Sequence, residues 1–82
     1  MEHQRPDVPL DDLRTAAAEH PEAAAAVDAF HAEYASDAPD PARLAAHADR
    51  LRGFPALAGP FERWYLEPSV QAFIAELNAI GL

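Results

Sequence analysis

Apolar positions along most of the chain recur every three or four residues, which is the spacing of one face of an α-helix. Three such stripes are formed by Leu10, Leu13 and Ala17, by Ala23, Val27, Phe30 and Tyr34, and by Leu44, Ala48 and Leu51. No stretch alternates apolar and polar positions with β-branched residues, as a strand would. The pattern therefore predicts an all-α fold.

Eight prolines divide this helical pattern into short segments. Proline is tolerated at the first position of a helix and disfavoured inside one, because it lacks an N–H group and clashes with the preceding turn. If prolines open the helices, these are expected at residues 9–19, 21–35, 41–52, 60–66 and 68–80. Between the third and fourth, an irregular apolar connection has room for one short turn. The prediction is a small bundle of four to five short helices separated by proline-marked turns.

The ends of these segments also carry signals. Asp40 precedes Pro41, and a carboxylate there can accept hydrogen bonds from the first backbone N–H groups of a helix. Gly53 and Gly81 stand where a left-handed residue commonly ends a helix. Residues 1–7 precede the first stripe, so we expect a flexible tail there and a single helical domain over residues 8–82.

The stretch 59–74, GPFERWYLEPSVQAFI, is much richer in large apolar side chains than the chain before it. On one continuous helix, Phe61, Trp64 and Tyr65 would lie nearly opposite the apolar residues that follow. Pro68 stands at this change of phase and disfavours helical conformation in the residue before it. We favour two helices that meet at a bend, because both stripes then reach one core. A straight helix would leave one stripe facing outward.

Length and composition indicate one small domain of 82 residues. The absence of cysteine excludes disulfides and thiolate metal sites. The N-terminus lacks the pattern of a signal peptide, and no apolar run approaches the ~20 residues of a membrane span. We therefore expect a cytoplasmic protein without membrane contact. Twenty alanines and no lysine are the composition expected of a GC-rich bacterial genome.

The net charge of −8 is distributed unevenly. Residues 1–40 carry ten acids and two arginines, whereas residues 41–82 carry four of each, so all the excess charge lies in the first half. The large apolar residues are distributed the other way, with six of twenty before position 41. An acidic surface repels nucleic acid, so direct binding to nucleic acid is not expected.

Residues that could carry catalysis are few and scattered. His31 and His47 lie on different predicted helices and could approach each other, but neither belongs to an HExxH pair or a Cys/His cluster. Thr15, Ser36 and Ser69 suit caps, turns or helix surfaces. The sequence therefore predicts no catalytic, cofactor-binding or metal site, and no enzyme. A small enzyme or ligand carrier that uses His31 or His47 is the weakest of three interpretations.

The first interpretation is a non-enzymatic protein-binding module, such as an adaptor, a small subunit or an inhibitor. It would dock another protein or a second copy of itself through its apolar, aromatic C-terminal half. Aromatic residues and arginine are enriched at the energetic centres of interfaces. The expected contact residues are Phe54, Phe61, Arg63, Trp64, Tyr65 and Leu66. Trp64 and Tyr65 could equally fill the core of so small a domain.

The second interpretation is an acidic inhibitor, such as an immunity protein, an antitoxin or a nucleic-acid mimic, whose N-terminal helices face a basic partner. Its expected contact residues are Asp11, Asp12, Glu19, Glu22, Asp28 and Glu33. Salt distinguishes the two interpretations. Association driven by these acids weakens steeply as salt rises, whereas apolar docking does not.

Overall fold

The computed structural model describes the backbone of residues 6–80 and the side chains of residues 6–79. In this part the chain forms five helices and no strand, so the predicted all-α bundle is confirmed. The helices are α1 (Leu10–Ala16), α2 (Pro21–Tyr34), α3 (Pro41–Arg52), α4 (Pro55–Tyr65) and α5 (Pro68–Ile80).

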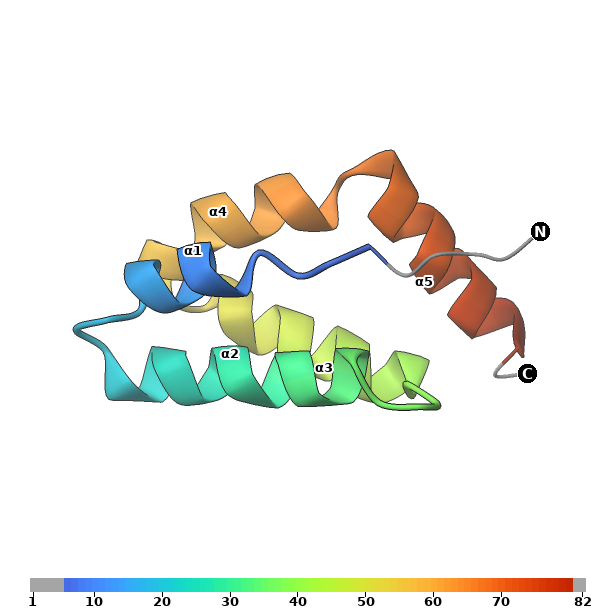
Figure 1. The fold of residues 1–82 in the computed structure, drawn as a ribbon, viewed down its shortest axis with the longest axis horizontal. Helices are drawn as coiled ribbons and strands as arrows, with labels where there is room; N and C mark the ends of the chain where they lie inside the picture. Colours follow the sequence, from blue (N-terminus) through green and yellow to red (C-terminus); the bar gives the residue numbers. More distant parts are fainter. Residues whose placement is uncertain (1–5, 81–82) are drawn as a thin grey trace.

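The first four helices surround one core (Figure 1). The antiparallel pair α2 and α3 lies on one side, and α4 packs against α3. The short α1 packs between α2 and α4, so each of the four helices has two neighbours in the ring. After α4 the chain turns, and α5 crosses one end of the bundle against α3 and α4.

Prolines open four of the five described helices, at Pro21, Pro41, Pro55 and Pro68. The residues before the first three of these prolines have extended backbones, which the proline ring requires of its predecessor. Pro9 differs from the prediction by one position, since it is the N-cap of α1 rather than its first residue. Proline thus sets where these helices begin.

The connection between the third and fourth helices differs from the prediction. Instead of an irregular stretch ended by Pro60, α4 begins at Pro55 and contains Pro60. Helical spacing from Leu57 to Phe61 places both residues on one face, and both are fully buried. Pro60 cannot donate to the carbonyl of Ala56, but Ala56 is exposed, so water can reach this turn. Burial of the apolar face therefore outweighs the missing hydrogen bond.

Gly53 ends α3 without the left-handed conformation that the sequence predicts, since its φ is −72°. The N–H of Gly53 donates to the carbonyl of Arg50 at 3.1 Å, and the N–H of Phe54 donates to the carbonyl of Leu51 at 3.2 Å. These bonds span three residues and satisfy the last carbonyls of the helix without a positive φ. The other predicted left-handed residue, Gly81, lies outside the described residues.

The centre of the core is aromatic. Phe30 of α2 meets Phe61 and Trp64 of α4 edge-on, with ring centroids 5.3 and 5.9 Å apart. One turn later, the Tyr34 ring lies 5.5 Å from Trp64 and 5.3 Å from Phe73 of α5. Edge-to-face pairs add about 0.5–1.5 kcal/mol each beyond the area they bury. The rings thereby join α2 to α4 and α5.

The predicted bend at Pro68 is confirmed. α4 ends at Tyr65 and α5 begins at Pro68, so the chain changes direction before the second apolar stripe starts. The bend brings Val70 into the core, where it is fully buried, and brings Phe73 onto the ring of Tyr34. A straight helix would have directed this stripe away from the core.

The alanine-rich face of α2 yields a stability prediction. Ala23 is fully buried, whereas Ala25 on the same helix is exposed. We expect Ala23→Leu to lower the free energy of unfolding by about 1–3 kcal/mol, because extra methylene groups would force the neighbouring helices apart. Ala25→Leu, the matched control, should change it by less than about 0.5 kcal/mol. Urea unfolding measures both, and equal stability of the two variants would contradict close packing at Ala23.

Candidate protein-binding surface

The six contact residues predicted for the C-terminal half are divided between core and surface. Phe61 has no exposed surface and Trp64 is 7% exposed, so both belong to the core of this chain. Both rings contact Phe30, and a domain with few large residues needs them to fill its centre. Phe61 and Trp64 are thus not accessible to a partner in this conformation, which corrects the expectation that they lie on the surface.

The other four predicted contact residues remain accessible to different degrees. Phe54 and Tyr65 are half-buried and pack against the core, while Arg63 is exposed. Leu66 is 62% exposed, and it is the one large apolar residue classed as exposed among the described side chains. Tyr65 stacks on Phe61 with ring centroids 5.1 Å apart, so the core supports it from beneath.

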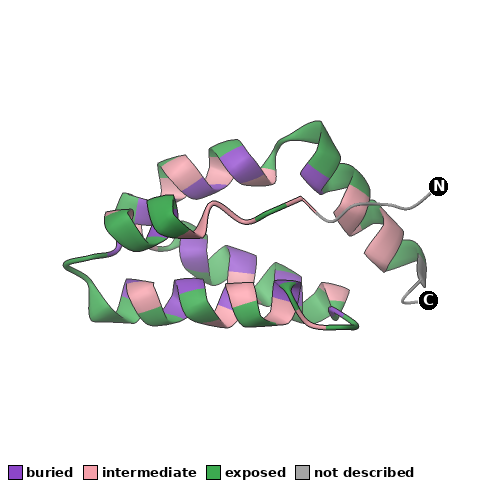
Figure 2. Cartoon of the chain, in the orientation of Figure 1, coloured by how far each residue is buried: buried purple, intermediate pink, exposed green. Residues whose placement is uncertain are grey.

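Partly accessible apolar side chains are concentrated at the end of α4 and along α5. Eight large apolar side chains of the described part are not fully buried, and five of them lie here. They are Tyr65, Leu66, Phe73, Ile74 and Leu77, which we call the α4–α5 corner. Figure 2 shows that α5 is mainly half-buried or exposed, whereas α2, α3 and α4 carry rows of buried residues. Val70 is the one buried residue among the described side chains of α5.

Hydrogen bonds hold the backbone of this corner in place. The N–H of Leu66 donates to the carbonyl of Glu62 at 3.0 Å, and the N–H of Glu67 donates to the carbonyl of Trp64 at 3.1 Å. From α5, Gln71 Nε2 donates to the carbonyl of Tyr65 at 2.6 Å. Leu66 is therefore displayed from a fixed turn, and a fixed turn loses little conformational entropy when a partner binds.

Arg52 of α3 covers one side of the corner. Its guanidinium lies 4.9 Å from the centre of the Tyr65 ring and forms ion pairs with Glu62 and, at 2.9 Å, with Asp49. The hydrogen bond to Glu62 raises the pKa of Arg52 above its ordinary value, so the cation persists throughout the working pH range. The sequence analysis did not include Arg52 among the contact residues. The only sequence signal for it was the spacing of Asp49 and Arg52, which places both on one face of the helix.

The six predicted acidic contact residues also separate into two groups. Asp28 and Glu33 form ion pairs within the chain, and Asp28 lies 3.0 Å from Arg14 of α1. The other four are exposed and form no ion pair with any described residue. They are Asp11, Asp12, Glu19 and Glu22. Among the six predicted acids, those without an ion-pair partner among the described residues therefore lie around α1 and the start of α2.

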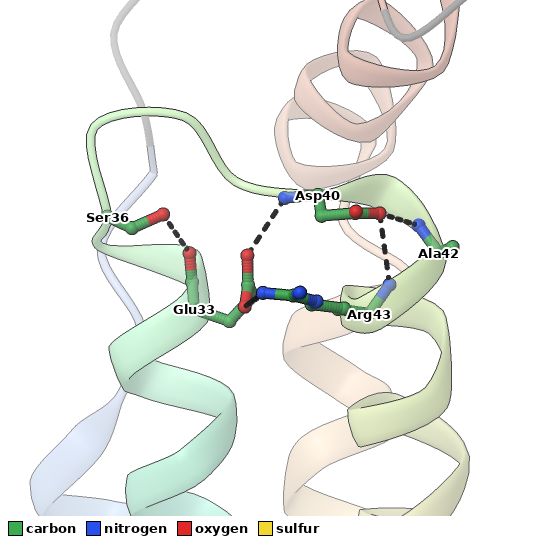
Figure 3. Close-up of polar contacts among 5 residues, drawn as sticks. All are labelled: Glu33, Ser36, Asp40, Ala42 and Arg43. Atoms are coloured by element: carbon green, nitrogen blue, oxygen red, sulfur yellow. Dashed lines mark hydrogen bonds and ion pairs between the residues drawn. The ribbon is translucent and has the colours of Figure 1, made fainter.

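Glu33 serves the connection between α2 and α3 (Figure 3). One carboxylate oxygen accepts from the N–H of Asp40 at 2.9 Å, and the other lies 3.9 Å from Arg43 Nη1. Asp40 caps α3 as predicted, since Oδ1 accepts from the N–H groups of Ala42 at 2.8 Å and Arg43 at 3.3 Å. Ser36 Oγ donates to the carbonyl of Glu33 at 2.8 Å. The side chain of Glu33 is only 15% exposed, so it offers a partner little surface.

The residues weighed for other chemistry do not form a recognisable site. His31 and His47 are half-buried on α2 and α3, and no three His, Asp or Glu side chains of the described residues gather where they could hold a metal ion. None of the described helices combines the length and apolar character needed to cross a membrane. Comparisons with protein-family models, curated proteins and solved structures found no match. The functional proposal therefore depends on the geometry of this chain.

The division between core and surface can be tested by truncation. Phe61→Ala should lower the free energy of unfolding by about 3–5 kcal/mol, because it empties the centre of the aromatic core. Leu66→Ala should change it by less than about 0.5 kcal/mol, because this side chain is mostly exposed. Chemical denaturation followed by circular dichroism measures both. A large loss of stability in Leu66→Ala would show that Leu66 is buried within the chain.

The cap of α3 gives a separate prediction. Asp40→Ala removes the acceptor for two backbone N–H groups and should cost about 0.5–2 kcal/mol of stability. Asp37→Ala, in the same loop but exposed and outside the cap, is the matched control. Thermal unfolding at neutral pH measures the difference between these variants. Identical midpoints would mean that the Asp40 side chain does not cap the helix.

Proposed function

We propose that this chain is a non-enzymatic protein-binding module that docks a partner through the α4–α5 corner. The observation that carries the proposal is the 62% exposure of Leu66 beside four half-buried apolar residues. A domain with few large apolar residues would gain stability by burying them, yet five remain at least partly accessible at the end of α4 and along α5. Exposed apolar patches with polar edges are typical of protein-interaction sites.

The surroundings of the corner suit this role. Arg63 and Glu67 are exposed and Glu62 is half-buried, so charged groups of both signs border the apolar residues. Interfaces commonly combine an apolar centre with a polar rim. Residues 41–82 carry no net charge, so this half of the chain can approach a partner without strong repulsion. The acidic half would then restrict which proteins approach.

An acidic inhibitor remains the second candidate, because four predicted contact residues on α1, on the start of α2 and in the turn between them are exposed and unpaired among the described residues. They are Asp11, Asp12, Glu19 and Glu22. Carboxylates in this state can pair with a basic surface and accelerate its approach. This function would leave the α4–α5 corner free in the complex, so the two candidates predict different contact positions.

Site-specific photocrosslinking in the native host tests the proposal. A photoreactive residue replaces Leu66 in one variant, Glu22 in a second and Ala46 in a third; all three positions are exposed. We expect a discrete adduct from position 66 and none from position 46, the matched control on α3. An adduct at twice the mass of the chain would identify a second copy as the partner.

Adducts from position 22 but not from position 66 would contradict docking through the corner and favour the acidic inhibitor. Salt provides an independent criterion for whichever adduct forms. An apolar contact should persist when cell extracts are irradiated at about 0.5 M salt, where the screening length falls well below 10 Å. An adduct that disappears under this condition indicates contact through charge.

A further inference from the structure

Residues 6–9 run as an extended segment beside the seam between α2 and α4 before α1 begins (Figure 1). Two core aromatic side chains donate to their backbone. Tyr34 Oη donates to the carbonyl of Pro6 at 2.6 Å, and Trp64 Nε1 donates to the carbonyl of Asp7 at 2.8 Å. We call residues 6–9 the N-terminal arm, and the surface around Tyr34 and Trp64 that receives it the arm cleft. The last two residues of the predicted flexible tail thus form hydrogen bonds with the domain.

The rest of the arm fits this attachment. Val8 is half-buried and packs against the core, whereas the side chain of Asp7 is exposed. Pro9 has φ −75° and ψ 67°, and the N–H of Leu10 donates to the carbonyl of Val8 at 2.7 Å. This is the geometry of an inverse γ-turn, which leads the arm into α1. Val8, the two prolines and the two carbonyls lie against the domain, whereas the side chain of Asp7 contributes little to the contact.

The chemistry of the arm cleft is that of a receptor for a proline-containing peptide. Grooves lined by aromatic residues bind such segments in several domain families, because the segments are already extended and lose little entropy on binding. Prolines also lack N–H groups, so fewer backbone donors need partners. Here Trp64 and Tyr34 supply two donors for peptide carbonyls, and prolines occupy both ends of the arm.

We propose that the arm cleft is a binding site for an extended, basic, proline-containing segment of a partner protein, and that the arm occupies it in cis. Its basic character follows from charge. Beside Trp64 lies a groove of about 590 Å³, lined by Asp12 and Glu67 with Arg63 as its one cation among the described residues. The chain as a whole carries a net charge of −8. A basic segment would gain an attraction that the arm lacks.

Competition between arm and partner is built into this arrangement. A short tether gives the arm an effective concentration of the order of millimolar, so a weak peptide cannot displace it. An empty cleft would remove the partner of the Trp64 N–H, and an unpaired donor in apolar surroundings is costly. We therefore expect the arm to leave the cleft when the backbone of a partner segment takes its place as acceptor for Trp64. The groove shares Arg63 and Glu67 with the border of the α4–α5 corner, but the arm contacts Tyr34 and Trp64, so the inference does not rest on the function proposed above.

The fluorescence of Trp64 reports on the cleft because it is the only tryptophan of the chain. In the double variant Pro6→Gly, Val8→Gly, the arm loses a restricted backbone and an apolar contact, while both carbonyls and the cleft remain. We expect the fraction of molecules in which the arm has left the cleft to rise roughly tenfold or more. The emission of Trp64 should then shift to the red, because its ring becomes exposed to water. Two peptides with uncharged ends should then reverse the shift. They are RPDVPL, which has the sequence of residues 5–10, and RPRVPL, in which arginine replaces the aspartate. The basic peptide should bind roughly two- to five-fold more tightly at low salt.

Controls distinguish peptide recognition from general loosening. Pro21→Gly, an exposed proline at the start of α2, should leave the emission unchanged. The glycine peptide RGRVGL should bind less well than RPRVPL. If circular dichroism shows that the double variant is unfolded, Pro6→Gly alone is titrated, and reversal by RPRVPL is again expected.

Three results would overturn the proposal. Unchanged emission in the folded variants would mean that the arm does not cover Trp64. Failure of RPRVPL to reverse a red shift at millimolar concentration would mean that the cleft does not accept a peptide in trans. A dimeric mass for the unmodified chain in sedimentation, lost in the double variant, would show that the occupant is the arm of a second copy.

Discussion

Alanine supplies 20 of the 82 residues, so α1, α2 and α3 have little side-chain volume with which to build a core. The volume comes from aromatic rings that α2 and α4 bring together, with Phe30 at the centre against Phe61 and Trp64. The other elements depend on this contact. α5 reaches it through Phe73, and the N-terminal arm reaches it through the polar edge of Trp64. Loss of the contact between α2 and α4 would therefore weaken the attachment of both ends of the described chain.

The acidic side chains have several different roles in this structure. Asp40 and Glu33 organise the loop between α2 and α3, and Asp28 joins α2 to α1 through Arg14. The exposed acids around α1 have no such structural partner among the described residues. The net charge alone does not show this difference between acids that have structural partners and acids that have none. Surface pairs such as that of Asp28 contribute little stability, at most about 1 kcal/mol, so their value lies mainly in orienting the helices.

The sequence was sufficient for the fold class, three of the five helix starts, a fourth to within one residue, and the bend at Pro68, because proline acts locally and helical periodicity is strong. It was insufficient for α4, where tertiary burial of Leu57 overrides the local preference of Pro60. The site was harder to predict. Sequence spacing identified an aromatic segment but could not show which faces α2 would cover, so Phe61 and Trp64 were placed with Leu66. Contacts of the arm with Trp64 leave no local signal, since they join distant residues.

The hydrogen bond between Asp7 and Trp64 links residues that are 57 positions apart, and the contact of Phe30 on α2 with Trp64 on α4 also joins residues distant in sequence. Proteins are synthesised from the N-terminus, so the arm and α2 leave the ribosome well before the rings they pack against. Until then the nascent chain exposes mostly alanine and acid, which stays hydrated and repels its neighbours. The aromatic core is complete only when α4 appears. The acidic half of the chain thus precedes most of the aromatic residues. This order would delay folding until a complete core is available, and would limit the time for which incomplete chains can aggregate.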